Sequence, residues 1–166
     1  ICNIDTRQIT NRIRSKGAPK GGIIEGPINN KKTALCLKEI KKWKGLNGLD
    51  LAIEVSRKDI KICKSKNKSS LKVVAVDYGI KENILNCLLD LDLELILVPA
   101  KTSAEKILKY NPHGNFLSNG PGDPKATGKY AIPIIKKLFK ENIPIFGICL
   151  GHQLISLALG AKTKKM

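Results

Sequence analysis

Residues 71–166 of this 166-residue chain predict an α/β fold with a doubly wound, mostly parallel sheet. Four short apolar runs alternate there with four segments of helical periodicity, which is typical of parallel strands joined by crossover helices. The apolar runs do not alternate with polar residues, as expected of strands covered on both faces. Residues 1–65 follow a different pattern and predict the end of a smaller α+β N-terminal domain. The polar stretch 64–70 predicts a linker between the two.

Two helices and two short strands are predicted within the smaller domain. Asp5 and Thr33 are expected to cap the helices, because each short polar residue precedes an amphipathic segment. Residues 51–55 and 60–63 have the length and apolar content of strands.

The larger domain predicts a regular order of strands and helices. A Thr-Ser-Ala-Glu capping box at 102–105 begins one of the helices. The strands are expected at residues 73–76, 93–98, 115–118 and 143–146, and the helices at 83–91, 102–110, 130–141 and directly after Cys149.

The segment 147–151, Gly-Ile-Cys-Leu-Gly, joins the last strand to the last helix. Glycines on both sides of a cysteine at such a junction predict a nucleophile elbow, in which the sharp turn leaves no room for side chains. The helix that follows favours a thiolate at Cys149 through its N-terminal dipole. The alternative interpretation is a buried structural cysteine in an apolar strand.

A second glycine-rich loop, Asn-Gly-Pro-Gly-Asp-Pro at 119–124, follows the third strand. Parallel strands end at one edge of a sheet, so this loop is expected beside Cys149. The N–H groups of Gly120 and Gly122, with that of Leu150, are candidates for an oxyanion hole. The alternative is an ordinary strand-to-helix connection. The spacing fits neither a phosphate-binding P-loop nor a dinucleotide-binding loop.

Neither histidine is expected to act as the base for Cys149. His152 lies three residues along the same helix, which places it beside the elbow rather than over the sulfur, so a packing role is expected. His113 precedes a turn glycine and is expected to be exposed. The base is therefore expected outside these 166 residues.

Composition narrows the class of protein. The net charge of +16 invites a nucleic-acid-binding interpretation, but the lysines are dispersed and aromatic residues make up only 4%. Five irregularly spaced cysteines predict free thiols in a reducing, cytoplasmic setting, without a disulfide framework or a metal site. No apolar run is long enough to span a membrane. The missing initial methionine and the abrupt end are expected of an internal fragment.

These motifs together resemble those of class I glutamine amidotransferases, and most of all the family of small, glutamine-hydrolysing subunits of carbamoyl-phosphate synthases. The elbow and the 117–124 loop match the nucleophile and oxyanion motifs of the class. The segment 76–84, Val-Asp-Tyr-Gly-Ile-Lys-Glu-Asn-Ile, is more selective for the carbamoyl-phosphate synthase type. The match extends over nearly the whole chain and is loosest between residues 33 and 68.

The resemblance implies a role for particular residues. Cys149 would be the nucleophile, and Gly120, Gly122, Leu150 and Gln153 would contact glutamine. The catalytic histidine and glutamate of the family would lie after Met166, and a glutamine-binding serine before Ile1. The partner would be the large synthetase subunit, in a heterodimer or a higher oligomer, with ATP and Mg²⁺ bound there and no cofactor or metal in this chain.

Three other functions are weighed against this one. The glutaminase component of another synthase, such as anthranilate or GMP synthase, would share the elbow. A basic nucleic-acid-binding α/β module would explain the charge, and a thiol-redox protein would use the cysteine but needs a resolving partner. On the amidotransferase interpretation, residues 1–166 alone are expected to be inactive, because they lack the base.

Overall fold

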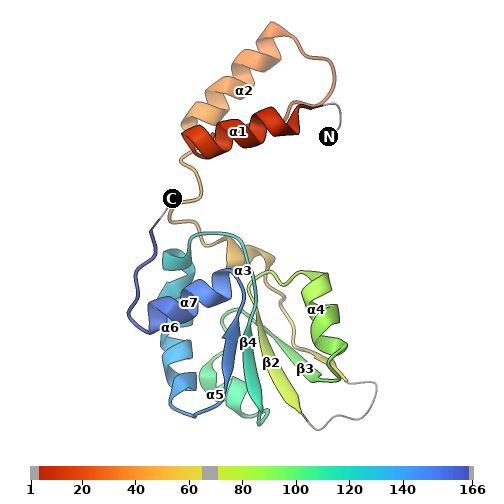
Figure 1. The fold of residues 1–166 in the computed structure, drawn as a ribbon, viewed down its shortest axis with the longest axis vertical. Helices are drawn as coiled ribbons and strands as arrows, with labels where there is room; N and C mark the ends of the chain where they lie inside the picture. The colour runs from red at the N-terminus through yellow and green to blue at the C-terminus, as the bar shows by residue number, and fades with distance from the viewer. Residues whose placement is uncertain (1–3, 65–70, 165–166) are drawn as a thin grey trace. The chain divides into compact units, whose positions relative to one another are not determined.

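The computed structural model describes residues 4–64 and 71–164, which form two compact units (Figure 1). The first unit reaches to Gly45, and the second runs from Leu46 to Lys164. The doubly wound sheet predicted from the sequence lies in the second unit.

The first unit contains two amphipathic helices, α1 (Thr6–Lys16) and α2 (Asn30–Lys42). Asp5 caps α1 as predicted, since its side chain accepts a hydrogen bond from the N–H of Gln8 at 2.8 Å. No residue within the bounds of either helix is buried. The apolar faces of these helices are therefore partly exposed.

The predicted cap of α2 is wrong. Asn29 caps the helix instead, accepting from the Lys32 N–H at 2.8 Å, while the Thr33 hydroxyl donates to the Asn29 carbonyl at 3.0 Å. Several polar residues between 29 and 33 could act as the N-cap. The helix follows the first of them, Asn29, whose side-chain oxygen accepts a hydrogen bond from the backbone N–H three residues later.

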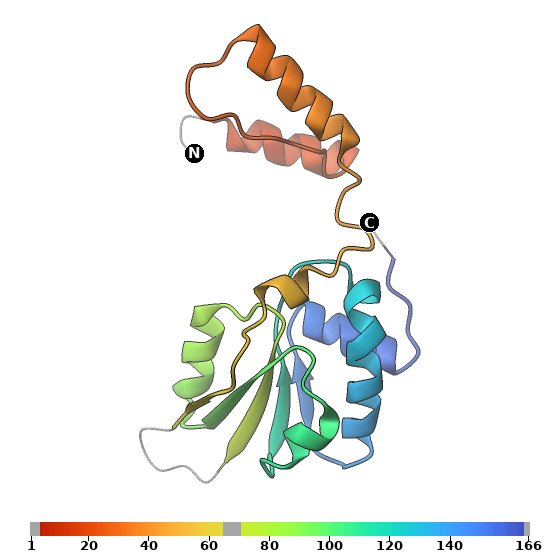
Figure 2. The ribbon, with the colours of Figure 1, turned by 180° about the vertical axis from the view of Figure 1, so that it is seen from behind.

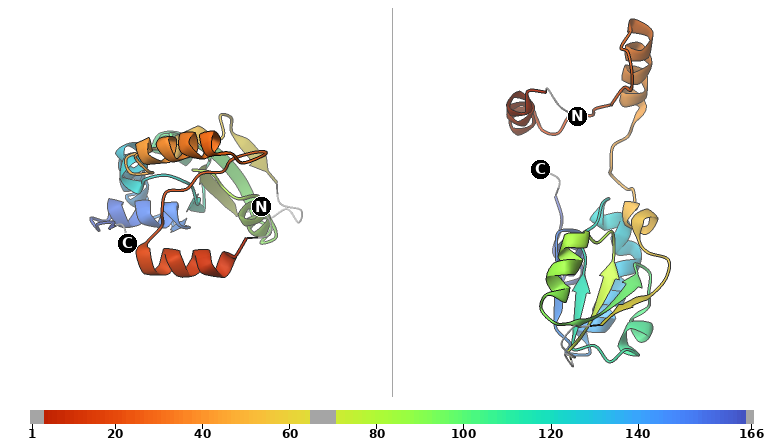
Figure 3. Two further views of the ribbon diagram at one scale, coloured as in Figure 1. Left: turned by 90° about the horizontal axis from the view of Figure 1, so that it is seen from above. Right: turned by 90° about the vertical axis from the view of Figure 1, so that its right-hand side faces the viewer.

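The second unit is built on a five-stranded sheet, which confirms the predicted fold class. Its strand order is β1-β3-β2-β4-β5, with β1 antiparallel and the other neighbours parallel. Figure 3 shows β2 and β4 running in the same direction. The strands are β1 (Lys61–Cys63), β2 (Lys72–Asp77), β3 (Glu94–Pro99), β4 (Gly114–Leu117) and β5 (Ile145–Gly147).

Helices cover both faces of this sheet, with α4 on the side opposite to α6 and α7 (Figures 1 and 2). Alternate residues of β2 separate the two cores: Val74 and Val76 pack with α5, α6 and α7, whereas Ala75 packs with α4. The helices are α3 (Leu51–Val55), α4 (Glu82–Leu89), α5 (Ala104–Leu108), α6 (Pro124–Phe139) and α7 (Leu150–Ala158).

Two elements differ from the sequence prediction in type or extent, and α5 is capped by Ser103 rather than by Thr102 of the predicted capping box. Residues 51–55 form helix α3 rather than a strand, because burial of Ala52 against the main core outweighs the local strand propensity. Helix α6 begins at Pro124 and not at Tyr130, since Asp123 caps it and proline is well suited to a first helical position.

The boundary between the units also lies elsewhere than the sequence pattern suggests. The pattern places a boundary near residue 65, whereas residues 46–64 pack with the second unit. Strand β1 is the reason, because it pairs with Leu95–Leu97 of β3 and completes one edge of the sheet. Residues 65–70 of the predicted linker lie outside the described residues.

Candidate active site

Cys149 lies at the sharp turn between β5 and α7. Its backbone has φ 52° and ψ −108°, a region that residues with a side chain seldom adopt. The strain is held by hydrogen bonds on both sides of the cysteine, from the Ile148 N–H to the Leu117 carbonyl and from the Gly151 N–H to the Ser118 carbonyl, each 3.1 Å. Such strain at an exposed nucleophilic side chain is typical of an active site.

The two glycines of the elbow are required by close packing. A Cβ atom on Gly147 would lie 2.6 Å from the carbonyl carbon of Gly151, and one on Gly151 would lie 2.1 Å from the Leu117 oxygen. Both contacts are with backbone, which cannot move away as a side chain can. The last strand, the first turn of α7 and the end of β4 are therefore in direct contact, and the cysteine points outward from that junction.

Helix α7 begins at Leu150, immediately after the cysteine. The Leu150 side chain is buried, which anchors the helix, and its N–H is one of the first four in α7, which have no partner within a helix. The positive end of the helix dipole points at Cys149. The arrangement stabilises negative charge beside the sulfur, whether on a thiolate or on an attacked carbonyl oxygen.

The loop after β4 is tied to the turn after β2. The Ser118 hydroxyl accepts from the Tyr78 N–H at 2.9 Å and donates to the Asn119 carbonyl at 2.7 Å. The Asn119 side chain accepts from the Lys81 N–H at 3.1 Å and donates to the Gly79 carbonyl at 2.9 Å. The start of the loop therefore has a defined conformation.

Gly120 and Gly122 are glycines for steric reasons. A Cβ on Gly120 would lie 2.2 Å from the Tyr78 oxygen, and Gly122 has φ 103° with a Cβ position only 2.8 Å from the Leu49 oxygen. Within the part of the chain that the structure describes, neither N–H donates a hydrogen bond to protein. Both backbone donors are therefore available to a ligand.

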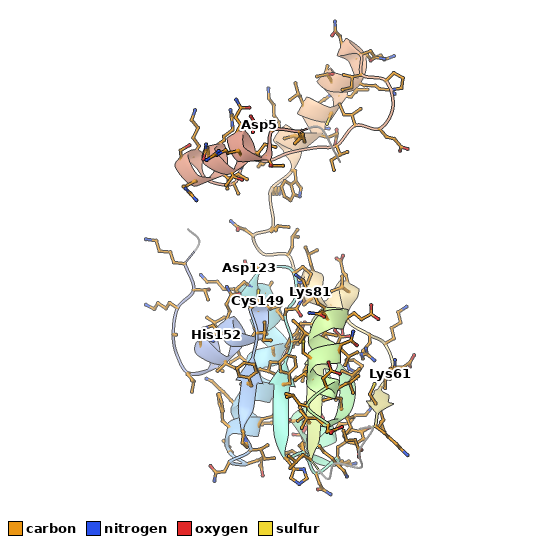
Figure 4. All side chains as sticks on the ribbon, turned by 45° about the vertical axis from the view of Figure 1, so that its right-hand side comes forward. Asp5, Lys61, Lys81, Asp123, Cys149 and His152 are labelled. Atoms are coloured by element: carbon orange, nitrogen blue, oxygen red, sulfur yellow. The ribbon has the colours of Figure 1, made fainter. Side chains whose placement is uncertain are left out.

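The structure brings this loop and Cys149 to one edge of the sheet. Strands β4 and β5 are parallel neighbours with Leu117 opposite Gly147, so the loops that follow them begin side by side. Figure 4 shows Asp123, on the loop after β4, at the same end of the sheet as Cys149. A thiol at the same end of the sheet as unpaired backbone N–H groups is suited to acyl transfer through a covalent intermediate.

The two histidines lie in different places. His113 precedes β4, at the opposite edge of the sheet, where its Nδ1 accepts from the Lys72 N–H at 3.0 Å. His152 is exposed on the first turn of α7 (Figure 4), and among the described residues no hydrogen bond joins it to the cysteine. Gln153 is also exposed, one residue further along, with its N–H bonded to the Cys149 carbonyl at 3.0 Å.

Three charged residues near this end of the sheet have contacts that the sequence did not predict. Asp77, which is 4% exposed, accepts from the N–H groups of Gly79 and Ile80 at 2.9 Å and forms a 3.0 Å ion pair with Arg57. Asp50 accepts from two side chains of α6. Asp77 followed by Gly79 is a recognisable Asx-turn signal, but no local pattern pairs it with Arg57 or connects Asp50 to α6.

The described residues contain no group of three or more His, Cys, Asp or Glu side chains placed to hold a metal ion. Cys36, Cys63, Cys87 and Cys149 are all unpaired thiols. A search of residues 4–64 and 71–164 for a helix long and apolar enough to cross a membrane finds none.

Comparison with known proteins gives one family and a group of similar relatives. Residues 74–166 match the family model described as glutamine amidotransferase class-I. The matched range includes most of β2, the Gly120 loop and the cysteine elbow.

Similar relatives include several described as the carbamoyl phosphate synthase small chain. Those of Bartonella quintana (strain Toulouse), Agrobacterium fabrum (strain C58 / ATCC 33970) and Escherichia coli (strain K12) are each 48% identical to this chain, over 177, 179 and 180 residues. Each alignment covers 100% of this chain and 44%, 45% and 46% of the respective relative. The chain therefore spans a little under half the length of the curated relatives that it matches.

Proposed function

The chain belongs to the class I glutamine amidotransferase family, and from this premise we propose that it carries the nucleophile of the glutamine-hydrolysing subunit of a carbamoyl-phosphate synthase. The 48% identity to small chains of that enzyme supports this choice over the glutaminase of anthranilate or GMP synthase. The observation that carries the proposal is the strained, exposed Cys149 between two glycines with no room for a Cβ, ahead of a helix N-terminus.

In the proposed mechanism the Cys149 thiolate attacks the side-chain amide carbon of glutamine. The N–H groups of the Gly120 loop and of Leu150 stabilise the tetrahedral oxyanion. The C–N bond breaks, ammonia leaves with a proton supplied by a histidine outside this chain, and a γ-glutamyl thioester remains. Water then attacks the thioester, releasing glutamate and restoring the thiol. Gln153 contributes a contact to bound glutamine from the first turn of α7.

The ammonia would pass to a large synthetase subunit, which is the proposed partner. There it would be combined with bicarbonate at the expense of ATP, with Mg²⁺ bound to that subunit, and the carbamoyl phosphate formed would supply arginine and pyrimidine synthesis. The proposed chemistry of this chain uses no metal or cofactor of its own. Its unpaired cysteines agree with a reducing, cytoplasmic location.

Replacing the nucleophile tests the proposal. In the complete protein assembled with its partner, Cys149→Ser is expected to abolish carbamoyl phosphate synthesis from glutamine and to leave synthesis from free ammonia intact. The control is Cys87→Ser, which alters another exposed cysteine, on α4. Full glutamine-dependent synthesis by Cys149→Ser would refute the assignment.

The positions of the two histidines lead to a further prediction. His113 is at the wrong edge of the sheet and His152 has no bond to the sulfur, so we expect no ammonia release from purified residues 1–166 in millimolar glutamine. Loss of a general acid and base typically costs ~10²–10⁴-fold in rate. Turnover that disappears in His152→Ala would show instead that His152 is the base.

A further inference from the structure

Residues 46–57, which we call the brace, come from the region that the sequence pattern assigns to the smaller domain, yet they contact the loops of the candidate site. We infer that the brace is a positioning element that holds the 119–123 loop, with its Gly120 and Gly122 N–H groups, in the conformation that stabilises the oxyanion. The inference rests on the proposed function and adds to it residues that touch neither the cysteine nor a substrate.

The first contact joins the brace to the end of the loop at Asp123. The Asp123 carboxylate accepts from the Gly48 N–H at 2.8 Å, and the Asp123 N–H donates to the Leu49 carbonyl at 2.9 Å. The same carboxylate also caps α6 through the Lys125 N–H at 2.9 Å. Asp123 therefore connects the loop to both the brace and the helix.

The second contact is steric and concerns Gly122. The position that a Cβ would occupy lies 2.8 Å from the Leu49 oxygen and 2.9 Å from the Leu51 nitrogen. A Cβ on Gly120 would lie even closer to the Tyr78 oxygen, at 2.2 Å. The loop is thus held between the brace and the turn after β2, with one glycine against each.

The third contact fixes the brace itself to α6. The Asp50 carboxylate accepts from the Thr127 hydroxyl at 2.9 Å and from the Tyr130 hydroxyl at 3.3 Å. Burial and, after it, the Asp50 charge raise the pKa of Tyr130 above its usual range, so its hydroxyl remains a neutral donor. The Asp50 side chain does not cap α3. Among the described residues, its carboxylate accepts hydrogen bonds only from Thr127 and Tyr130.

The far end of the brace reaches the other two loops of the same sheet edge. Arg57 pairs at 3.0 Å with Asp77, the last residue of β2, and Val55 lies 2.8 Å from the Cβ position of Gly79 in the turn that follows. The Ser56 hydroxyl accepts from the N–H of Ala100, directly after β3, at 2.9 Å. The brace therefore contacts the segments that follow β2, β3 and β4. One short segment sets the relative position of three loops, of which one supplies the proposed oxyanion donors.

A loop of this composition needs such support. Glycine loses more backbone freedom on ordering than any other residue, so a free Gly-Pro-Gly segment would sample many orientations of its N–H groups. A displacement of about 1 Å at a reacting centre can cost ~10²-fold in rate. The contacts of Asp50 and Asp123 restrict the loop before glutamine arrives.

Two substitutions in the complete protein test the inference. Asp50→Ala removes the acceptor of both α6 hydroxyls, whereas Asp50→Asn keeps an oxygen that can still accept from Thr127. We expect Asp50→Ala to lower kcat for glutamine hydrolysis about tenfold, below the ~10²–10³-fold cost of losing a whole oxyanion donor, with a much smaller change in KM. Asp50→Asn is expected to retain most of the activity.

A second pair of substitutions, at Thr127, tests the same contact in case Asp50→Ala does not fold. Thr127→Val deletes the fully buried hydroxyl and keeps its shape, and Thr127→Ser restores it. The matched control is Ser103→Ala, which removes the cap of α5 and lies outside the brace contacts. The rate at which iodoacetamide alkylates Cys149 is measured for every variant, because alkylation needs an accessible thiolate and no oxyanion hole.

The outcomes separate the two proposals. A fall in kcat for Asp50→Ala and Thr127→Val, rescue by Asn and Ser, and an unchanged alkylation rate would support the brace. If the wild type hydrolyses glutamine and the kcat values of Asp50→Ala and Thr127→Val equal that of the wild type or of Ser103→Ala, the inference about the brace is overturned. The proposed function is unaffected by that result. Failure of the wild-type complete protein to hydrolyse glutamine would overturn the proposed function itself.

Discussion

At the scale of single residues, the site depends on where backbone atoms approach each other. Four glycines near the sheet edge, at 120, 122, 147 and 151, occupy positions where a Cβ would lie within 3 Å of another backbone atom. Cys149 lies among them with a positive φ that a residue bearing a side chain adopts only under constraint. The sulfur is exposed at the same end of the sheet as the unpaired N–H groups of the Gly120 loop.

We predict that Cys149 is the first cysteine to be alkylated in the complete protein. Cys87 is the matched comparison, because it is also exposed but lies within α4 rather than ahead of a helix N-terminus. The dipole of α7 stabilises negative charge at sulfur, and the thiolate is the form that reacts. Mass spectrometry after brief iodoacetamide treatment should find Cys149 modified first, with protection by glutamine. Faster modification of Cys87 or Cys36 would contradict this prediction.

At the scale of elements, the elbow works because α7 packs directly on the end of β4. The contact passes through Gly151, whose N–H bonds to the Ser118 carbonyl and whose missing side chain admits the Leu117 carbonyl. The loop after β4 is held in turn by α6 through the Asp123 cap. The positions of the nucleophile and the proposed donors therefore derive from the same strand.

Gly151→Ala is expected to lower the free energy of unfolding by roughly 1–3 kcal/mol or more, the usual cost of overpacking. The new methyl group would lie 2.1 Å from the Leu117 oxygen, so either β4 or α7 must shift. Gly114→Ala on β4, the strand that Gly151 contacts, is the control, since the nearest neighbours of the new Cβ would be 3.7 Å away or more. Urea unfolding of both variants checks the prediction, and equal midpoints would contradict it.

The Asp123 carboxylate makes a pH-dependent contribution to stability. Its hydrogen bonds, first from the Gly48 N–H and then from the Lys125 N–H, hold the pKa of Asp123 below its ordinary value. A lowered pKa stabilises the folded state fully above the unfolded value of about 3.9, and the contribution is lost as pH falls below it. The stability difference between the wild type and Asp123→Asn should therefore be constant above about pH 5 and should shrink in acid. A difference independent of pH would exclude the charge as its source.

At the scale of the whole molecule, the second unit includes more of the chain than the regular βα pattern covers. Residues 46–63 contribute the antiparallel edge strand β1, the buried Ala52 and the Arg57–Asp77 ion pair. The first unit, in contrast, has helices without a buried residue. Most of the apolar core among the described residues lies after Gly45.

This division predicts the result of truncation. Two variants, one beginning at residue 46 and one at residue 71, are to be compared with the same C-terminal end. The first keeps β1 and the brace, so we expect its thermal unfolding midpoint to remain close to that of the parent. The second exposes the edge of β3 and the core around Ala52, and should unfold at a clearly lower temperature or aggregate. Equal midpoints would show that residues 46–63 add nothing to the unit.

The sequence by itself determined the features that depend on local patterns. The parallel sheet follows from apolar runs alternating with helical segments, and the elbow follows from the glycines at 147 and 151 at a strand-to-helix junction. The Asp5 cap was also visible, because it concerns neighbours in sequence. That the base for Cys149 lies elsewhere stays a prediction. The reactive roles of Cys149, Gly120 and Gln153 stay predictions.

Only the tertiary structure decided the features that depend on distant contacts. Residues 51–55 are helical because Ala52 is buried against the core, and 46–64 join the second unit because β1 pairs with β3. The brace joins residues about 75 positions apart, Gly48 to Asp123 and Asp50 to Thr127. No periodicity or spacing carries such pairings, because a hydrogen bond between distant residues depends on how the sheet and its helices pack and not on the residues that flank each partner.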